Sequence, residues 1–275
     1  MANFRLTSEQ VAAYHRDGYL IVPNFLSSAE TDKLAGIAIS DAAMDRHAFD
    51  LNDQTGKKTR LTLWYQPGDD AYGLLTRSRR MVESADALME GRSAVCHFHS
   101  KLMQKEPRVG GAWEWHQDYG YWYKNEFLFP DQMLSVMIAI TAATKENGCL
   151  QVIGGSHKMG RIEHGFTGEQ VGASQHFVDL ALKTMPLVYV ELAAGDALFF
   201  HSNLLHRSAA NLSDTARWSL ISCYNRETNT GYNEPNGSHQ VAVSVVDDLA
   251  LLESATGGLQ ETAGFLEKDK DEALK

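Results

Sequence analysis

The pattern of short apolar runs beyond Ser93 restricts the fold of this chain more than any other feature of its sequence. Residues 96–105 alternate from one side chain to the next, as a strand with two different faces does. Runs of similar character follow, separated by Gly, Pro and Asn, at 134–141, 147–153, 187–192, 197–200 and 217–224. Many short strands with turn residues between them are typical of a β-sandwich or β-barrel. We therefore predict a mainly β core over residues 93–230.

The first 92 residues carry helix signals, because Thr7 or Ser8 and then Ser27 can cap the free N–H groups of a following helix. The predicted elements are helices over residues 6–17, 27–40 and 71–87, with strands at 19–22 and 59–65. A tail from residue 231 contains a helical stretch at 246–252 and a charged end at 267–272. No internal repeat or low-complexity linker is visible, so we expect one domain over residues 1–275.

Two connections in the core carry specific predictions. Residues 158–186 show little periodicity, and we expect a long excursion of the kind that often covers a functional site. Gly195-Asp196 lies between two apolar runs and predicts a hairpin turn that joins them.

Composition limits the partners of the protein. The 275 residues carry a formal net charge of −10, which argues against nucleic acid or an anionic membrane surface as a partner. No secretory signal or membrane-spanning apolar run is visible. Cys96, Cys149 and Cys223 are widely separated and odd in number, so we expect reduced, buried thiols. These features favour a cytoplasmic protein that acts on a small molecule.

A chemical site is indicated by the aromatic stretch from Trp113 to Tyr123, which contains His116 and Asp118. If this stretch is a strand, residues two apart share a face, and the imidazole and the carboxylate point to one place. Two histidines and one carboxylate form the facial triad that holds non-haem Fe(II) with coordination positions left open. His201 and His206 are the candidates for the second imidazole.

An arginine follows His206 at a distance that a single turn can span. Asn211-Leu-Ser-Asp214 can reverse the chain so that Arg217 returns beside His206 on an adjacent strand. A guanidinium there can bind a carboxylate with two parallel hydrogen bonds, as the distal carboxylate of 2-oxoglutarate requires. Ser208 shares the face of His206 and could donate a further hydrogen bond.

At these residues the sequence resembles the phytanoyl-CoA dioxygenase family of Fe(II)/2-oxoglutarate-dependent oxygenases. The resemblance rests on four segments: Asp17-Gly-Tyr-Leu-Ile-Val-Pro23, Trp115-His-Gln-Asp118, Glu146-Asn-Gly-Cys-Leu-Gln-Val-Ile-Gly-Gly-Ser-His157, and Asp196 to Ser208 with Arg217. It covers residues 6–224 and implies a double-stranded β-helix, or jelly roll, with flanking N-terminal helices.

The resemblance also implies the chemistry and the roles of individual residues. It implies Fe(II), 2-oxoglutarate and O2 as the cofactor and cosubstrates, with release of succinate and CO2. His116, Asp118 and His206 would be the iron ligands, and Arg217 with Ser208 would bind 2-oxoglutarate. Lys101 falls, more loosely, where family members place a residue beside the cosubstrate. An acid at position 118 favours hydroxylation, because halogenating relatives carry a small residue there.

Other polar and aromatic side chains have structural explanations beside functional ones. His157 is expected to hold a turn, and His201 to pack near the site rather than bind metal. Strand alternation places His97 and His99 on the face of Lys101, where they could line the pocket. The aromatic group contains Trp113, Trp115, Tyr119, Tyr121, Trp122 and Tyr123, which are core residues by default; Tyr119 and Tyr121 could also form a cage for a cationic substrate.

Three alternatives remain open on the sequence alone. The first is a jelly-roll protein that binds a metal or a small molecule without turning it over. The second is a metal-dependent hydrolase or isomerase with the same triad, which would not need Arg217. The third is an oxygenase of the same family that acts on an acyl-CoA, although no basic cluster suited to the phosphates of CoA is apparent.

Overall fold

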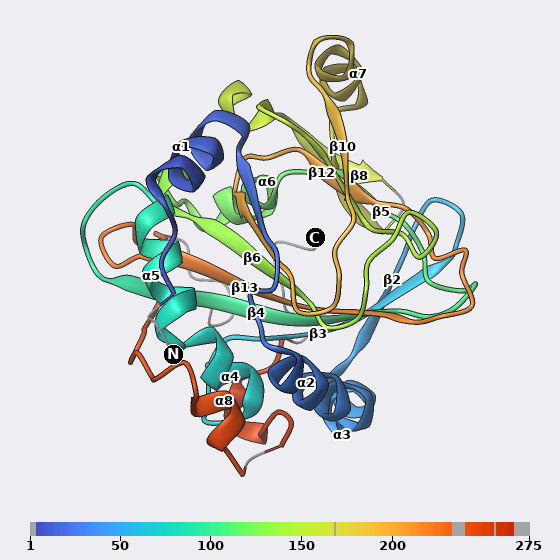
Figure 1. Cartoon of the computed structure of the whole chain (residues 1–275). Helices are drawn as coiled ribbons and strands as arrows, with labels where there is room; N and C mark the ends of the chain where they lie inside the picture. The colour runs from blue at the N-terminus through green and yellow to red at the C-terminus, as the bar shows by residue number, and fades with distance from the viewer. Residues whose placement is uncertain (1–3, 168, 233–239, 256, 267–275) are drawn as a thin grey trace.

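Two antiparallel β-sheets pack against each other and form the centre of the computed structural model, which describes residues 4–167, 169–232, 240–255 and 257–266 (Figure 1). The larger sheet is built from β1 (Tyr19–Val22), β2 (Phe49–Asn52), β3 (Lys58–Trp64), β4 (Val95–Lys105), β6 (Leu134–Ala139), β11 (Ala197–His201), β13 (Arg217–Arg226) and β14 (Val241–Ala242). Its strand order is β1-β11-β6-β13-β4-β3-β2, and β14 pairs with β4.

The smaller sheet contains β5 (Trp113–His116), β7 (Leu150–Ile153), β10 (Leu187–Val190) and β12 (His206–Ser208). Its order is β10-β7-β12-β5, so strands distant in sequence are neighbours. A separate hairpin consists of β8 (His164–Thr167) and β9 (Gln170–Ala173). Two facing sheets whose successive strands change sheet are typical of a jelly roll, and the predicted fold class is confirmed.

Helices cover the face of the larger sheet that points away from the smaller one (Figure 1). They are α1 (Ser8–Asp17), α2 (Ser28–Ser40), α3 (Ala42–His47), α4 (Ala71–Thr76), α5 (Arg79–Leu88) and α8 (Ala250–Glu253). Thr7 and Ser27 form capping boxes at the starts of α1 and α2, as their sequence predicts. Gly18, with a φ of 81°, ends α1 in the left-handed conformation that glycine adopts without strain.

Strand β11 contributes side chains both to the core beneath the helices and to the core between the two sheets. Ala197 and Phe199 point toward the helices, whereas Leu198 and Phe200 point between the sheets. The strand is buried on both faces, so it reads as a continuous apolar run rather than an alternating one. The inter-sheet core also receives Leu150 and Val152 from β7, and the candidate site lies within this layer.

The structure corrects two predictions about connections. The excursion at 158–186 is not irregular, because it contains the β8–β9 hairpin and α7 (Gln175–Thr184), which protrudes from the smaller sheet in Figure 1. The turn at Gly195-Asp196 does not close a hairpin, because β10 pairs with β7 whereas β11 pairs with β6. Turn chemistry was recognised correctly, but in a jelly roll a turn also carries the chain from one sheet to the other.

Smaller differences concern the elements outside the predicted core. The helix predicted over 71–87 is divided into α4 and α5 at Arg77 and Ser78. The strands predicted at 19–22 and 59–65 are confirmed as β1 and β3, and the N-terminal part also supplies β2, which was not predicted, to the larger sheet. In the tail, α8 covers only part of the predicted helix, and the charged end at 267–272 lies outside the described residues. None of the described helices is long and apolar enough to span a bilayer.

Candidate functional site

Two imidazoles meet where β5 ends and β12 begins. His116 is the last residue of β5, His206 is the first of β12, and the two are directly opposite in the register of these antiparallel strands. Their ring centroids lie 4.1 Å apart, and both side chains are buried. Backbone pairing of two short strands therefore brings together residues that are 90 positions apart in sequence (206 minus 116).

The carboxylate arrives from a helix and not from the predicted strand. The extended chain stops at Gln117, and Asp118 is the first residue of α6 (Asp118–Trp122). Strand parity therefore does not explain the proximity of His116 and Asp118. The turn from β5 into α6 explains this proximity, because it places Asp118 Oδ1 3.8 Å from Nε2 of His116 and 3.8 Å from Nε2 of His206.

Gln117 holds this turn through its buried side chain. Its Nε2 donates to the carbonyls of Gly160 and Asn203, each at 2.7 Å, and its Oε1 accepts from the Ile162 amide at 2.7 Å. Its backbone N–H donates to Nε2 of His164 at 3.0 Å. Three of these hydrogen bonds attach the predicted excursion to the residue between His116 and Asp118, and the fourth attaches that residue to Asn203 in the connection before β12.

Hydrogen bonds fix which nitrogen of each imidazole faces the carboxylate. Nδ1 of His116 lies 2.7 Å from the Glu114 carbonyl, and Nδ1 of His206 lies 2.9 Å from the Leu204 carbonyl. A carbonyl only accepts, so each Nδ1 carries the proton and each Nε2 keeps its lone pair. Both lone pairs are thereby available beside Asp118.

Burial sets the charge of these groups. It lowers the pKa of His116 well below its usual value, and the neighbouring His206 lowers it further. Burial likewise lowers the pKa of His206, against the opposing effect of Asp118. For Asp118, burial alone would raise the pKa. The positive charge of Lys101 opposes this effect most strongly, followed by the neighbouring His206 and a hydrogen bond from Ser135, and together they hold the pKa below its ordinary value. Neutral imidazoles beside an ionised carboxylate are the protonation states that bind metals.

This donor set suits a divalent transition metal. Within the described part of the chain, His116, Asp118 and His206 are the one group of three such side chains whose ligand atoms all lie within 4.8 Å of one another. Bonds from first-row metals to imidazole and carboxylate are about 2.0–2.2 Å, so one ion can bridge atoms 3.8 Å apart. Two imidazoles and one carboxylate match the non-haem Fe(II) arrangement.

Arg217 reaches the same interior from the opposite sheet. It begins β13, which pairs with β4 and β6, whereas β12 pairs with β5 and β7. The prediction that Arg217 lies on the strand adjacent to His206 is therefore wrong. The connection between β12 and β13 crosses to the other sheet, and Arg217 lines the pocket that contains His206 from across the interior.

The guanidinium of Arg217 is buried without a counterion. Its Nη1 donates to the Gly148 carbonyl, its Nε has no hydrogen-bond partner, and no ion pair involves it among the described residues. Burial lowers the pKa of Arg217 to about 10. An unpaired buried charge of this kind is costly, and a carboxylate bound in the pocket would compensate it.

One pocket contains both the triad's imidazoles and the arginine. Its lining is Lys101, Met103, Trp113, His116, Met137, Leu150, Phe200, His206, Ser208, Arg217, Ser219 and Ile221. Ser208 lies here as expected. Ser219 was not anticipated, although it follows Arg217 by two residues on the same strand, and strand parity would have identified it. Its hydroxyl is buried and has no hydrogen-bond partner in the described part of the chain, so it is a second donor available to an anion.

Lys101 lies at the metal-facing end of this pocket. Its Nζ is 4.0 Å from Asp118 Oδ1, and its side chain is mostly buried. The structure therefore brings Lys101 beside the carboxylate of the triad as well as into the pocket. An ammonium at this place favours bound anions, whether they belong to a cosubstrate or to a substrate.

His97 and His99 do not share a face. The pairing of β4 with β13 skips Phe98, because His99 pairs with Cys223 and His97 with Tyr224. Such a bulge reverses the alternation of side chains. His97 accordingly contacts the Tyr65 carbonyl and Ser100. His99 packs edge-on against Trp122, and burial followed by Lys101 lowers its pKa well below the usual value.

The remaining candidates have structural roles. His201 Nε2 lies 2.9 Å from an oxygen of Asp131, and its ring is 5.2 Å from that of His157. Neither histidine belongs to the His-Asp-His group. The hydroxyls of Tyr119 and Tyr121 donate to the carbonyls of Phe127 and Val171, so these rings are fixed in place. Tyr121 packs at right angles to His116, with centroids 5.6 Å apart, and forms a wall of the site. The three cysteines are buried and free, as predicted.

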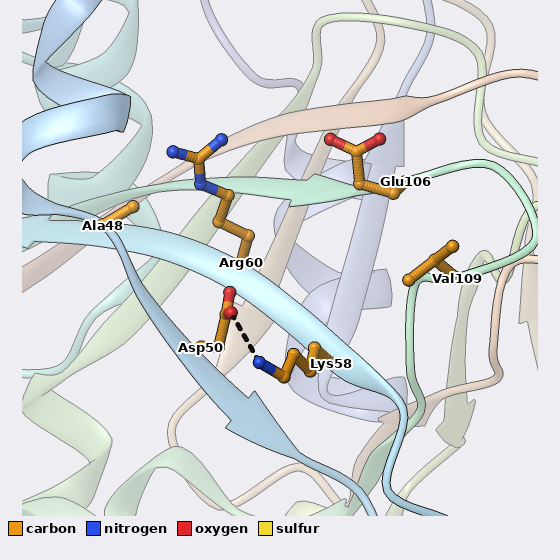
Figure 2. A pocket seen from close by; sticks show the side chains of 6 residues that line it. All are labelled: Ala48, Asp50, Lys58, Arg60, Glu106 and Val109. Atoms are coloured by element: carbon orange, nitrogen blue, oxygen red, sulfur yellow. Dashed lines mark ion pairs between the residues drawn. The ribbon is translucent and has the colours of Figure 1, made fainter.

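A second hollow, at the edge formed by β2 and β3, has different chemistry. Figure 2 shows its lining, which is Ala48, Asp50, Lys58, Arg60, Glu106 and Val109. Lys58 pairs with Asp50 at 3.4 Å, and Arg60 pairs with Asp45 at 2.9 Å. These charges are compensated and open to solvent, in contrast to Arg217.

Comparison with known proteins agrees with this geometry. The sequence matches the phytanoyl-CoA dioxygenase (PhyH) family over residues 14–219. It is 28% identical to an L-proline trans-4-hydroxylase from Streptomyces griseoviridis, over 79% of this chain and 85% of that protein. It is 31% identical to phytanoyl-CoA dioxygenase 1 from Oryza sativa subsp. japonica, over 78% of this chain and 87% of that protein.

A solved structure supports the fold. The crystal structure of EctD from S. alaskensis with 2-oxoglutarate and 5-hydroxyectoine superposes with a TM-score of 0.71 at 19% identity, covering 90% of this chain and 89% of that one. The expected fold agrees with this structure, and the expected enzyme class agrees with the hydroxylase and dioxygenase relatives. EctD itself has been solved with bound Fe and with 2-oxoglutarate, which are the metal and the cosubstrate expected here. The chain belongs to the phytanoyl-CoA dioxygenase family of Fe(II)/2-oxoglutarate-dependent oxygenases.

Proposed function

We propose that this protein hydroxylates a small substrate, with Fe(II) held by His116, Asp118 and His206 and with 2-oxoglutarate anchored by Arg217 and Ser208. The observation that carries the proposal is the unpaired, buried guanidinium of Arg217 in the pocket that contains both imidazoles. A hydrolase or an isomerase with the same triad would have no use for it. A protein that only stores a metal would not need it either.

Each side chain has a definite task in this proposal. When bound, Fe(II) supplies the chemistry that couples decarboxylation of 2-oxoglutarate to oxidation of the substrate. His116 and His206 present neutral Nε2 atoms, held in this tautomer by the Glu114 and Leu204 carbonyls. Arg217, Ser208 and Ser219 hold the distal carboxylate, and apolar side chains such as Met137 and Phe200 exclude water.

A small substrate that bears an anionic group suits this site best. The relatives include enzymes named for proline, ectoine and methylphosphonate, each a small molecule with a carboxylate or phosphonate. Lys101 is the cation nearest Asp118, and it could receive such a group. The aromatic walls formed by Trp113 and Tyr121 could cover the cationic part of a zwitterion.

An acyl-CoA substrate is the second candidate, because phytanoyl-CoA dioxygenases are among the relatives. The pocket lining offers Lys101 and Arg217 as its cations, and Arg217 is committed to 2-oxoglutarate in this proposal. We also infer a cytoplasmic location, which the three buried free cysteines support.

Succinate formation in the presence of Fe(II), 2-oxoglutarate and O2 tests the proposal. The substrate panel would contain L-proline, ectoine, methylphosphonate and phytanoyl-CoA. We expect stimulation by a small zwitterion or anion above the substrate-free rate, and no stimulation with Asp118→Ala. Stimulation by phytanoyl-CoA alone would establish the second candidate, and wild-type activity in Asp118→Ala would refute the proposed role of Asp118.

A further inference from the structure

The two oxygens of the Asp118 carboxylate have different surroundings. Oδ1 lies 3.8 Å from Nε2 of both His116 and His206 and 4.0 Å from Nζ of Lys101. Oδ2 points the other way and accepts a hydrogen bond from Oγ of Ser135 at 2.5 Å. One oxygen is therefore presented to the proposed iron position, and the other is occupied.

Ser135 is held rigidly in the larger sheet. It is the second residue of β6 and pairs with Phe200 of β11 on one side and with Cys223 of β13 on the other. Its side chain is fully buried, and Oγ lies 3.3 Å from the Cys223 thiol. A carboxylate only accepts hydrogen bonds, so the hydroxyl proton must point to Oδ2. The orientation of the serine hydroxyl is thus determined by its neighbours.

The number of oxygens that Asp118 gives to the metal affects the rest of the site. A carboxylate can bind a cation through one oxygen or through both. A second oxygen would occupy a coordination position that the facial triad otherwise leaves open for the cosubstrate. A hydrogen bond that engages Oδ2 opposes this chelation, because both interactions use the same lone pairs.

We propose that Ser135 is a positioning residue that keeps Asp118 a one-oxygen ligand and so preserves the coordination position for 2-oxoglutarate. This inference rests on the proposed role of Asp118 as an iron ligand. It assigns to Ser135 an effect on cosubstrate affinity that exceeds its effect on metal affinity. A side chain that only stabilised the fold would change neither or would weaken both together.

The test consists of two anaerobic titrations of the whole protein without substrate. Equilibrium dialysis measures the binding of Fe(II), and the visible absorption of the complex then measures the binding of 2-oxoglutarate to the Fe(II) form. Ser135→Ala removes the hydroxyl. Ser135→Thr keeps it and suits a strand. Ser100→Ala is the matched control, because Ser100 is equally buried on β4 but is bonded to His97 and Ser222.

We expect Ser135→Ala to bind 2-oxoglutarate at least about tenfold more weakly, because the freed Oδ2 would compete for the coordination position of the cosubstrate. Its affinity for Fe(II) should fall by a smaller factor than its affinity for 2-oxoglutarate, because a second carboxylate oxygen adds a bond to the metal. Ser135→Thr and Ser100→Ala should resemble wild type in both titrations. Wild-type 2-oxoglutarate affinity in Ser135→Ala would overturn the inference. So would a Ser135→Thr variant that is as weak as Ser135→Ala, since the hydroxyl would then not be responsible.

Asp118→Ala separates this inference from the function on which it depends. If Asp118→Ala binds Fe(II) as tightly as wild type, the ligand role fails and the role of Ser135 falls with it. If Asp118→Ala loses Fe(II) while Ser135→Ala retains both affinities, the proposed function stands and the inference about Ser135 alone is refuted. Melting temperatures of all variants identify any that do not fold, and for such a case Ser135→Thr still decides the outcome.

Discussion

Replacing Arg217 with methionine should stabilise the ligand-free protein and at the same time remove its affinity for 2-oxoglutarate. The two effects have one cause. Among the residues that the structure describes, no carboxylate pairs with this buried guanidinium, so the free protein bears a cost that a bound anion would relieve. Methionine is similar in length, apolar and flexible enough to fill the same space.

The stability change follows from the pKa of Arg217, which burial lowers from its ordinary value to about 10. A base whose pKa is lower in the folded state binds its proton more weakly there, so the penalty is fully present below about pH 10 and disappears only above the ordinary pKa of arginine. A shift of this size corresponds to roughly 3 kcal/mol. The variant also loses the hydrogen bond to the Gly148 carbonyl, which contributes about 1 kcal/mol.

The net stabilisation is then about 2 kcal/mol, which for a chain of this size raises the melting temperature by about 4–8 °C. The effect on the cosubstrate has the opposite sign. Removing one partner of a buried, hydrogen-bonded charge pair costs about 2–5 kcal/mol, which corresponds to a 2-oxoglutarate KM higher by about 30-fold to several thousand-fold.

Thermal unfolding with and without 2-oxoglutarate, together with succinate release at varied 2-oxoglutarate, measures both effects. Arg207→Met is the matched control, because Arg207 is bonded to Gln151 and stacked on Trp115 outside the pocket. Its 2-oxoglutarate KM should stay unchanged. A lower melting temperature for ligand-free Arg217→Met, with a KM within threefold of wild type, would refute the assignment of Arg217 as the anchor.

Three further predictions concern the triad and the histidines around it. Asp118→Ala should lower Fe(II) affinity at least tenfold, since the ligand set loses its only anion, and equilibrium dialysis measures this; unchanged affinity would contradict the ligand role. His201→Phe should lower stability by about 2 kcal/mol through loss of the hydrogen bonds to Asp131 and to the Asn203 amide, while Fe(II) affinity stays within threefold; a large loss of metal would make His201 a ligand. Burial lowers the pKa of four fully buried histidines, His97, His99, His116 and His206, so the unfolded chain takes up more protons than the folded one below pH 6.5. Ligand-free stability should therefore fall as the pH drops below 6.5, and a melting temperature that is unchanged from pH 7 to pH 5 would contradict this.

Local signals in the sequence predicted the parts of the fold that depend on local chemistry. The capping boxes of Thr7 and Ser27 begin α1 and α2, and Gly18 ends α1. These features involve contacts within four residues, so a single sequence contains all the information that they need. The choice of His206 rather than His201 came from the family resemblance, and it agrees with the geometry.

Predictions that required knowledge of sheet membership were less successful. Arg217 was expected beside His206 on one sheet, but it faces the pocket from the other. The turn at Gly195-Asp196 connects the two sheets and does not close a hairpin. Turn residues specify where the chain bends, but the packing of the whole core decides which sheet it enters next.

Two local irregularities made the predictions from strand alternation wrong. The bulge at Phe98 places His97 and His99 on opposite faces of β4, and α6 begins where Asp118 was expected to continue a strand. The alternation rule assumes a regular, unbroken strand, and the residue types at these positions did not indicate a bulge or a strand end. Ser219 was missed for the opposite reason, because alternation along β13 from Arg217 would have identified it.

An anaerobic crystal structure of the protein with Fe(II) and 2-oxoglutarate tests the central claim most directly. We predict one iron bound by Nε2 of His116, Nε2 of His206 and Oδ1 of Asp118, with the distal carboxylate of 2-oxoglutarate on the guanidinium of Arg217. Iron bound elsewhere, or 2-oxoglutarate bound without contact to Arg217, would contradict the account.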